Sequence, residues 1–215
     1  MHPVQRARVS TSVFKRIGVG IIIALGASVA VLAAYSGADK SVYEFSGAVS
    51  DPPRVMKDFV LTDQHGQDFQ LYEDGNDVSL VFFGYAICPD VCPTTLSDLI
   101  RVKRTLGESA GRVSFIWITV DPERDSPGIM GQRIAVFDPE FLGLYGDRKT
   151  LEPVWDDFNV VAFREEAQGS AAGYLISHSA FTYLIDRDMR MRVVFPFGAN
   201  PDDIAADVAA ILKEQ

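Results

Sequence analysis

FFGYAICPDVCPTTL, residues 82–96, decides the fold of this chain, because an apolar run stops there and a helix-like pattern begins. The stretch holds the only two cysteines, Cys88 and Cys92, so any redox or soft-ligand chemistry must use them. If Cys92 lies in the first helical turn, its spacing of four from Cys88 places both on the same side. Pro89 and Pro93 stiffen the loop, and Pro93 suits a first helical turn.

The two cysteines allow a functional and a structural interpretation. A helix N-terminus favours thiolate over thiol, which makes a sulfur there a better metal ligand and a better nucleophile. The alternative is a structural disulfide, or two buried side chains that act as small apolar residues. Paired cysteines flanked by prolines favour a redox or metal site.

Outward from this stretch, hydrophobic periodicity predicts alternating strands and helices. Strands are expected at 78–85, 113–120, 181–185 and 191–195, helices at 94–106, 127–137, 151–158 and 201–212, a short strand or turn at 142–147, and a hairpin with His65 and Gly66 in its turn. Asn200 is expected to cap the last helix. This order predicts an α/β sandwich with a mixed central sheet. The cysteine loop then lies at the carboxyl end of a central strand, where sites form in open α/β sheets.

The uncharged stretch 17–35 predicts a membrane span, because at about 1.5 Å per residue it can cross a hydrocarbon core of roughly 30 Å. Basic residues precede it, which places segment 1–16 in the cytoplasm and the folded domain outside. A cleavable signal peptide ending near Ser28-Val29-Ala30 is the alternative. Segment 36–53 is expected to be a linker, and 54–215 the folded domain, in a compartment where paired cysteines tend to oxidise unless a metal or a reductant protects them.

Charge limits the partners of this domain. Four of the 20 basic residues precede any acidic residue, so 16 basic and 29 acidic residues remain after Tyr35, a formal charge of −13. Nucleic acid is a poor partner for such a domain, because phosphate contacts need Lys and Arg. A basic protein partner is physically easier.

Three motifs carry a family resemblance: FFGYAICPDVCP at 82–93, VDPERDSP at 120–127 and YLISHSAFTYLID at 174–186. In this order, the chain from about Phe59 onward resembles the Sco/SenC family of thioredoxin-like copper chaperones for cytochrome c oxidase assembly. The resemblance implies a thioredoxin-like fold and a copper site formed by Cys88, Cys92 and His178. It also implies one N-terminal span in the inner membrane, with the domain on the periplasmic side.

Two positions depart from the family pattern. Ser177 stands where Asp commonly precedes the copper-binding histidine, and Ile87 stands where His is frequent before the first cysteine. Both departures leave the three expected ligands intact. They concern neighbours of the kind that orient a ligand and tune its metal.

The donor set suits copper. Two thiolates and one imidazole form a soft, low-coordination set for Cu(I), which can hold Cu(II) with an added ligand. A structural zinc site usually shows four protein ligands. Asp90 is expected to shape the loop, with a weak oxygen contact to the metal as the alternative. A lone histidine is more often structural than a ligand, and only the resemblance reverses this for His178.

Several neighbours of this site have expected roles. Asp121, Pro122 and Asp125 are expected to form a capped turn beside the cysteine loop, with a docking edge for a partner as the alternative. Tyr85 and Phe197 are expected at its rim. The remaining histidines are read as a turn residue, His65, and a residue before the span, His2. Core positions are assigned to the aromatic residues Phe82, Phe83, Trp117 and Phe181.

Two functions compete. The first is a metallochaperone that delivers copper to the copper-receiving subunit of cytochrome c oxidase, or prepares its thiols, and exchanges with other copper carriers or thiol reductants. The second is a thiol-disulfide oxidoreductase in which Cys88 attacks and Cys92 resolves. Three intervening residues, and no proline immediately before the strand at 181–185, weigh against the second. Copper binding is not catalysis, so enzymatic activity is expected only with the second function.

Overall fold

The computed structural model describes residues 43–166 and 173–215. The N-terminal segment 1–16 and the span expected at 17–35 lie outside the described residues. Among those described, no helix combines the length and the apolar character that crossing a bilayer requires. Residues Glu44–Gln215 form one compact unit.

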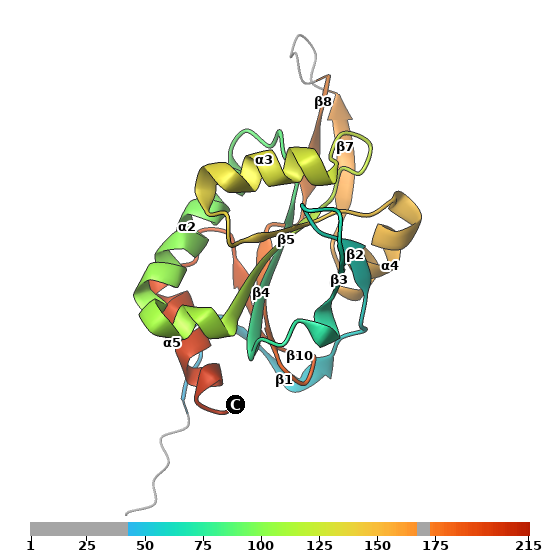
Figure 1. The fold of residues 1–215 in the computed structure, drawn as a ribbon. Helices are drawn as coiled ribbons and strands as arrows, with labels where there is room; N and C mark the ends of the chain where they lie inside the picture. The colour runs from blue at the N-terminus through green and yellow to red at the C-terminus, as the bar shows by residue number, and fades with distance from the viewer. Residues whose placement is uncertain (1–42, 167–172) are drawn as a thin grey trace, which may run out of the picture. The chain divides into compact units, whose positions relative to one another are not determined.

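A mixed six-stranded sheet lies at the centre of this unit (Figure 1). Its strands are β1 (Ala48–Val55), β4 (Val78–Gly84), β5 (Val113–Thr119), β6 (Leu142–Leu144), β9 (Phe181–Asp186) and β10 (Arg190–Pro196). Their spatial order is β1-β10-β9-β4-β5-β6. Strands β4, β5 and β6 run parallel, whereas β9 pairs antiparallel with β4, β10 with β9 and β1 with β10. The expected α/β class with a mixed sheet is confirmed.

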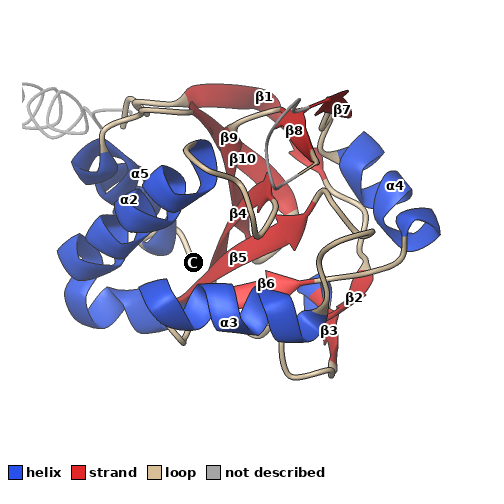
Figure 2. Cartoon of the chain, turned by 90° about the horizontal axis from the view of Figure 1, so that it is seen from above, coloured by secondary structure: helices blue, strands red, loops and turns tan. Residues whose placement is uncertain are grey.

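Helices cover both faces of this sheet, as Figure 2 shows. The helices are α2 (Val91–Leu106), α3 (Pro127–Phe137), α4 (Arg148–Asp157) and α5 (Pro201–Leu212). Helices α2, α3 and α5 lie on one side of the sheet and α4 on the other. Every residue of β4 and of β5 is buried, because parallel strands need crossover helices that shield both faces.

The helix ends differ from the sequence prediction by a few residues. Helix α2 begins at Val91 rather than at residue 94, so Cys92 and Pro93 both lie in its first turn. Helix α4 begins at residue 148 rather than 151, because the Asp147 side chain accepts the amide of Thr150 and caps it. Helix α5 has the predicted bounds, and the Asn200 side chain accepts the amide of Asp202.

The first strand lies within the segment expected to be a linker. Strand β1 starts at Ala48, so the fold begins before Arg54, where the sequence pattern placed its start. Pro52 and Pro53 are tolerated because β1 is an edge strand and needs partners on one side only. The segment just before β1 is bound to α5. The buried carboxylate of Asp207 in α5 accepts hydrogen bonds from the amide and the hydroxyl of Ser46 and from the amide of Gly47.

Two small hairpins and two 3₁₀ turns complete the described fold. Strands β2 (Val60–Thr62) and β3 (Asp68–Gln70) form the predicted hairpin, with Gly66 at φ +81° in its turn. Strands β7 (Ala162–Glu166) and β8 (Tyr174–His178) form a second hairpin that the sequence pattern did not predict. The 3₁₀ turns are η1 (Leu71–Glu73) and η2 (Gly107–Arg112). His178 is therefore the last residue of β8, at the base of a hairpin.

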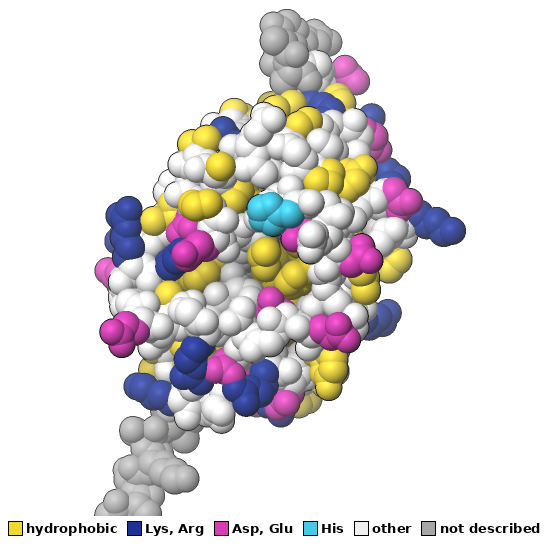
Figure 3. Space-filling view, in the orientation of Figure 1, with side chains coloured by type: hydrophobic (Ala, Val, Ile, Leu, Met, Phe, Trp, Pro, Cys, Tyr) yellow, Lys and Arg dark blue, Asp and Glu magenta, His cyan; other side chains and the backbone are white. Residues whose placement is uncertain are grey.

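The core contains most of the aromatic residues assigned to it. Phe82, Phe83 and Trp117 are buried, but Phe181 is 43% exposed and its assignment to the core is wrong. Phe181 is the first residue of β9, so it lies at the end of the sheet rather than in its middle. Acidic and basic side chains are interspersed on the face seen in Figure 3.

Candidate metal centre

The cysteine loop leaves the sheet at the carboxyl end of β4. The carbonyl of Gly84, the last residue of that strand, accepts the amide of Val120 at 2.8 Å. A turn follows, in which the Cys88 amide donates to the Tyr85 carbonyl at 3.1 Å. Helix α2 then begins at Val91, and the Cys92 amide donates to Cys88 Sγ at 3.4 Å. The Cys88 sulfur thus receives a bond from the N-terminal turn of α2.

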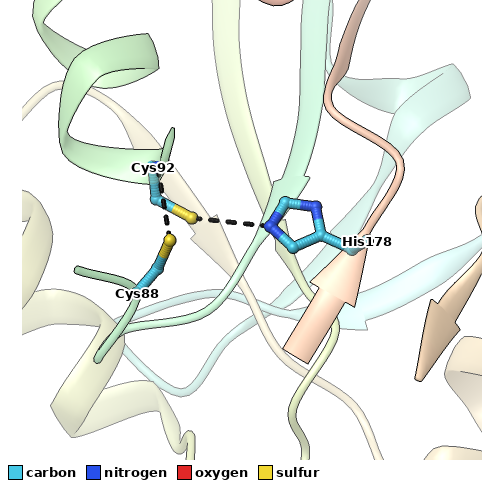
Figure 4. A group of neighbouring side chains, drawn as sticks. All are labelled: Cys88, Cys92 and His178. Carbon is cyan, nitrogen blue, oxygen red and sulfur yellow. Dashed lines mark hydrogen bonds between the residues drawn. The ribbon is translucent and has the colours of Figure 1, made fainter. Parts of the chain in front are cut away.

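Cys88, Cys92 and His178 converge on one point (Figure 4). One ligand atom from each lies within 4.8 Å of those of the other two. The Cys92 Sγ to His178 Nε2 distance is 3.9 Å. Both cysteines are buried and are free thiols, whereas His178 is half-buried. The loop, the helix and the hairpin each supply one side chain, so the fold places two sulfurs and one imidazole nitrogen around a common space.

The ring of His178 is oriented by the backbone that follows it. Its Nδ1 lies 3.0 Å from the carbonyl oxygen of Ser179, which can only accept, so Nδ1 carries the proton and donates. In the neutral ring Nε2 then keeps its lone pair and faces Cys92. The Tyr85 ring packs edge-on to the imidazole, with ring centroids 6.0 Å apart.

Ser177 takes no part in orienting His178. Its hydroxyl donates to Glu165 on the paired strand β7 at 2.7 Å. The Ser177 side chain therefore links β8 to β7, whereas the backbone carbonyl of Ser179 orients the imidazole of His178. Ile87, at the other departure from the family pattern, is 45% exposed.

The two thiols differ in acidity. A hydrogen bond from Cys92 lowers the pKa of Cys88 to about 4, against the opposing effect of burial and with help from two backbone amides. The bond to Cys88 and burial raise the pKa of Cys92 above its ordinary value. Cys88 is therefore the thiolate of the pair, and Cys92 keeps its proton and donates it toward Cys88.

Asp121 and Asp125 form the predicted turn next to the loop. The Asp125 amide donates to the Asp121 carbonyl at 2.9 Å. The Asp125 carboxylate accepts the Thr119 hydroxyl at 2.6 Å and the amide of Ala86, a residue of the cysteine loop, at 3.2 Å. Burial raises the pKa of Asp125 to about 6, although the Thr119 and Ala86 bonds act in the opposite direction. The turn formed by Asp121 and Asp125 therefore fixes the cysteine loop through the bond from the Ala86 amide to Asp125.

Gly84 is a functional position that sequence reasoning missed. A Cβ on this residue would lie 2.5 Å from Cys92 Sγ and 2.9 Å from Trp117 Nε1. Only a residue without a side chain lets α2 bring its sulfur this close to the strand. A glycine inside an otherwise apolar strand signals such a close approach, and it was available in the sequence.

The structure also places most of the other residues to which the sequence assigned roles near the site. Among the described residues, the group of converging ligand atoms includes neither Asp90 nor His65. Asp90 precedes α2, and its carbonyl, rather than its side chain, accepts the Thr94 amide. Tyr85 is buried beneath the site rather than at its rim, because its hydroxyl accepts the Ile176 amide; Phe197 is 46% exposed. His2 lies outside the described residues.

The donor set is chemically soft. Two sulfurs and one imidazole nitrogen suit Cu(I) and other thiophilic ions better than Mg²⁺ or Ca²⁺, which take oxygen ligands. A thiolate also offsets the charge of a buried cation, which would otherwise be costly. The residues present therefore fit a soft metal ion.

Comparison with known proteins finds a family model that matches this chain and solved structures with a similar fold. The model of the SCO1/SenC family matches residues 47–213. A SCO2-like protein of Rickettsia felis is 33% identical over 154 residues, which cover 72% of this chain and 75% of the relative. The structure of Bradyrhizobium japonicum ScoI with copper bound is 37% identical, with a TM-score of 0.66, and the match covers 74% of this chain and 99% of that one. Yeast Sco1 with copper bound is 26% identical, with a TM-score of 0.66 over 76% of this chain and 91% of that one. These likenesses confirm the expected thioredoxin-like fold.

Proposed function

This chain belongs to the SCO1/SenC family, and from that membership we propose that it is a copper-binding metallochaperone with Cys88, Cys92 and His178 as its ligands. The observation that carries the proposal is the convergence of the two sulfurs and Nε2 within 4.8 Å. Relatives solved with copper bound share its fold and are 37% and 26% identical to it over the matched residues. Copper is the cargo in this proposal and not a resident cofactor.

The chain's own residues explain how such a cargo is held. Cys88 is already a thiolate, so it binds a cation without first losing a proton. Cys92 gives up its proton when it binds. The Ser179 carbonyl keeps Nε2 of His178 directed at the same space. Because His178 is half-buried and both sulfurs are buried, the histidine side is the side from which an acceptor's ligands approach.

The same proposal covers the protein that receives the copper and the cellular location of this chain. The acceptor is the copper-receiving subunit of cytochrome c oxidase, and other copper carriers or thiol reductants load and reduce this protein. Segment 17–35 anchors it in the inner membrane, with the folded domain on the periplasmic side. The support is the family membership, the apolar composition of that segment and the basic residues before it.

A copper titration tests the proposal. The reduced full-length protein in detergent is titrated with Cu(I) and then with Cu(II), followed by absorption and electron paramagnetic resonance. We expect one copper ion per chain and a sulfur-to-Cu(II) charge-transfer band that is lost in Cys88→Ser, in Cys92→Ser and in His178→Ala. His65→Ala is the matched control and should behave as wild type. Wild-type protein that binds neither ion would refute the proposal.

A thiol-disulfide oxidoreductase is the second candidate, favoured by the lowered pKa of Cys88. In that reaction the Cys88 thiolate attacks a partner's disulfide and releases one partner thiolate. Cys92, deprotonated, then attacks the Cys88 sulfur and releases the second, which leaves a Cys88–Cys92 disulfide and a partner reduced by two electrons. Reduction of a disulfide substrate that survives His178→Ala and is lost in Cys88→Ser would favour this function. Dependence of the activity on His178 would favour the metal site.

A further inference from the structure

Trp117 carries a buried hydrogen-bond donor without a partner. The residue is 1% exposed, and its Nε1 has no acceptor among the residues that the structure describes. Buried polar groups are nearly always paired, so an orphaned donor calls for a physical reason. The chain's other tryptophan, Trp155, is an internal contrast, because its Nε1 donates to the Thr119 carbonyl at 3.1 Å.

The strand register places the Trp117 donor beside the metal centre. In the β4–β5 pair, Trp117 lies opposite Phe82, and their rings stack with centroids 5.8 Å apart and planes at 12°. Gly84 follows Phe82 by two residues and so lies on the same face of the sheet. The stacking fixes the plane of the indole, so its N–H is held next to Gly84.

The missing side chain of Gly84 leaves a space that is bordered by the Cys92 sulfur, the Trp117 indole nitrogen and a ring carbon of Phe82. Cys92 Sγ lies 2.5 Å, and Trp117 Nε1 2.9 Å, from the point where a Cβ would stand. The sulfur and the indole nitrogen therefore border the same small space. No hydrogen bond joins these two atoms in the structure.

We propose that the Trp117 indole N–H is a donor reserved for the Cys92 sulfur in its metal-bound thiolate form, which makes Trp117 a positioning residue of the metal centre. The inference rests on the proposed function, which makes Cys92 a ligand. When the metal displaces the Cys92 proton, the sulfur becomes an anionic acceptor, and bonds to charged acceptors are stronger than neutral ones. The orphaned N–H then gains its partner.

This bond has two measurable consequences. A donor that holds a ligand usually changes metal affinity by about 10- to 100-fold when it is removed. A hydrogen bond also lowers the energy of the sulfur lone pair, so its loss moves sulfur-to-Cu(II) charge transfer to longer wavelength. A purely structural role for Trp117 would leave the position of that band unchanged.

The indole proton itself is the first test. Wild-type full-length protein, ¹⁵N-labelled in detergent, gives one indole N–H signal from each tryptophan, assigned with Trp117→Phe. We expect Cu(I) to move the Trp117 proton downfield and to leave the Trp155 proton in place. Hg²⁺, which binds close pairs of thiolates, is the second probe and should give the same shift. A Trp117 proton that stays in place while the Cys88 and Cys92 amides respond to either ion overturns the inference.

Substitution is the second test. Trp117→Phe keeps an aromatic ring against Phe82 and removes the N–H, so we expect about tenfold weaker Cu(I) binding and a charge-transfer band at longer wavelength. Trp155→Phe is the matched control and should change neither. Wild-type affinity and band position in Trp117→Phe overturn the inference. If wild type binds Hg²⁺ but no copper, the proposed function fails, whereas the mercury spectra still decide the role of Trp117.

Discussion

Cys88 and Cys92 have the same side chain, but their surroundings give them different charges. Cys88 accepts hydrogen bonds from the Cys92 amide, in the first turn of α2, and from the Cys92 thiol. Cys92 lies deeper, at 1% exposure, and donates. The difference in charge between the two cysteines arises from the first turn of α2. A thiolate at Cys88 can bind a cation or attack a disulfide, so the same turn accounts for both activities.

Alkylation measures this difference directly. Because the pKa of Cys88 is lowered to about 4, its thiolate fraction is complete between about pH 6 and pH 8. We expect iodoacetamide to modify Cys88 before Cys92, at a rate that stays constant over this range, as followed by peptide mass spectrometry. In Cys92→Ala the side-chain donor is absent, so the pKa of Cys88 should be higher and the rate should rise with pH. A wild-type rate that climbs about tenfold per pH unit would contradict the assignment.

Asp125 gives a prediction for stability against pH. Burial raises the pKa of Asp125 from 3.8 to about 6. Between pH 3.8 and about pH 6, the carboxyl group is therefore protonated in the folded protein but ionised in the unfolded chain. The stabilisation is complete below the unfolded pKa and is lost as the pH rises through about 6. Relative to Asp125→Asn, wild type should lose about 2 kcal/mol of unfolding free energy from about pH 4 to pH 7.

Urea unfolding of both proteins across this range provides the measurement. Thr119→Val sharpens it, because this variant lacks the hydroxyl that donates to the carboxylate at 2.6 Å and lowers its pKa. The loss of stability should then occur at higher pH. A difference between wild type and Asp125→Asn that is independent of pH would show that the carboxyl group does not titrate in this way.

At the level of secondary structure, the approach of α2 to β4 depends on Gly84. Gly84→Ala places a Cβ 2.5 Å from Cys92 Sγ, so the helix start must shift. Overpacking of this kind costs about 1–3 kcal/mol, and we expect copper affinity to fall by at least about tenfold, because the sulfur moves away from the other ligands. Unfolding curves and copper titration of the variant measure both effects.

Gly128→Ala is the matched control for this substitution. Nothing lies within 4 Å of a Cβ at Gly128, which is in the first turn of α3. Alanine there should be neutral or stabilising by up to about 1 kcal/mol, with copper binding unchanged. Gly84→Ala protein with wild-type affinity and stability would show that the strand and helix have slack that the structure does not suggest.

The parts of the fold with strong patterns were predictable. The buried strands β4 and β5 read as continuous apolar runs, and α2 and α5 follow helical spacing, so the cysteine loop could be placed at the end of a strand from the sequence. Strand β1 could not, because two prolines and polar residues look like a linker, and only its edge position makes them acceptable.

The hairpin that carries His178 also escaped sequence reasoning. Strand β7 is exposed at four of its five residues, so no apolar alternation marks it. Its pairing with β8 depends on backbone bonds and on contacts such as Ser177 with Glu165. Periodicity therefore gave no reason to bring His178 to the cysteines, and the family resemblance alone indicated it. The acceptor that orients the His178 ring is the backbone carbonyl of Ser179, which no side-chain pattern can show.

At the scale of the whole molecule, the site exists because three segments meet at one end of the sheet. Cys88 and Cys92 come from the β4–α2 junction, whereas His178 lies 86 residues beyond Cys92 and arrives through the β7–β8 hairpin. The three ligands therefore come together only when the chain has folded. The two cysteines, which are close in the sequence, are only part of the ligand set. The central claim is that all three donors hold one copper ion.

X-ray absorption at the copper edge tests this claim most directly. For reduced full-length protein loaded with one equivalent of Cu(I), we predict a first shell of two sulfur atoms and one imidazole nitrogen, and in His178→Ala the loss of the imidazole signal with both sulfurs retained. A wild-type first shell that contains sulfur without imidazole, or that is the same in His178→Ala, would contradict the account.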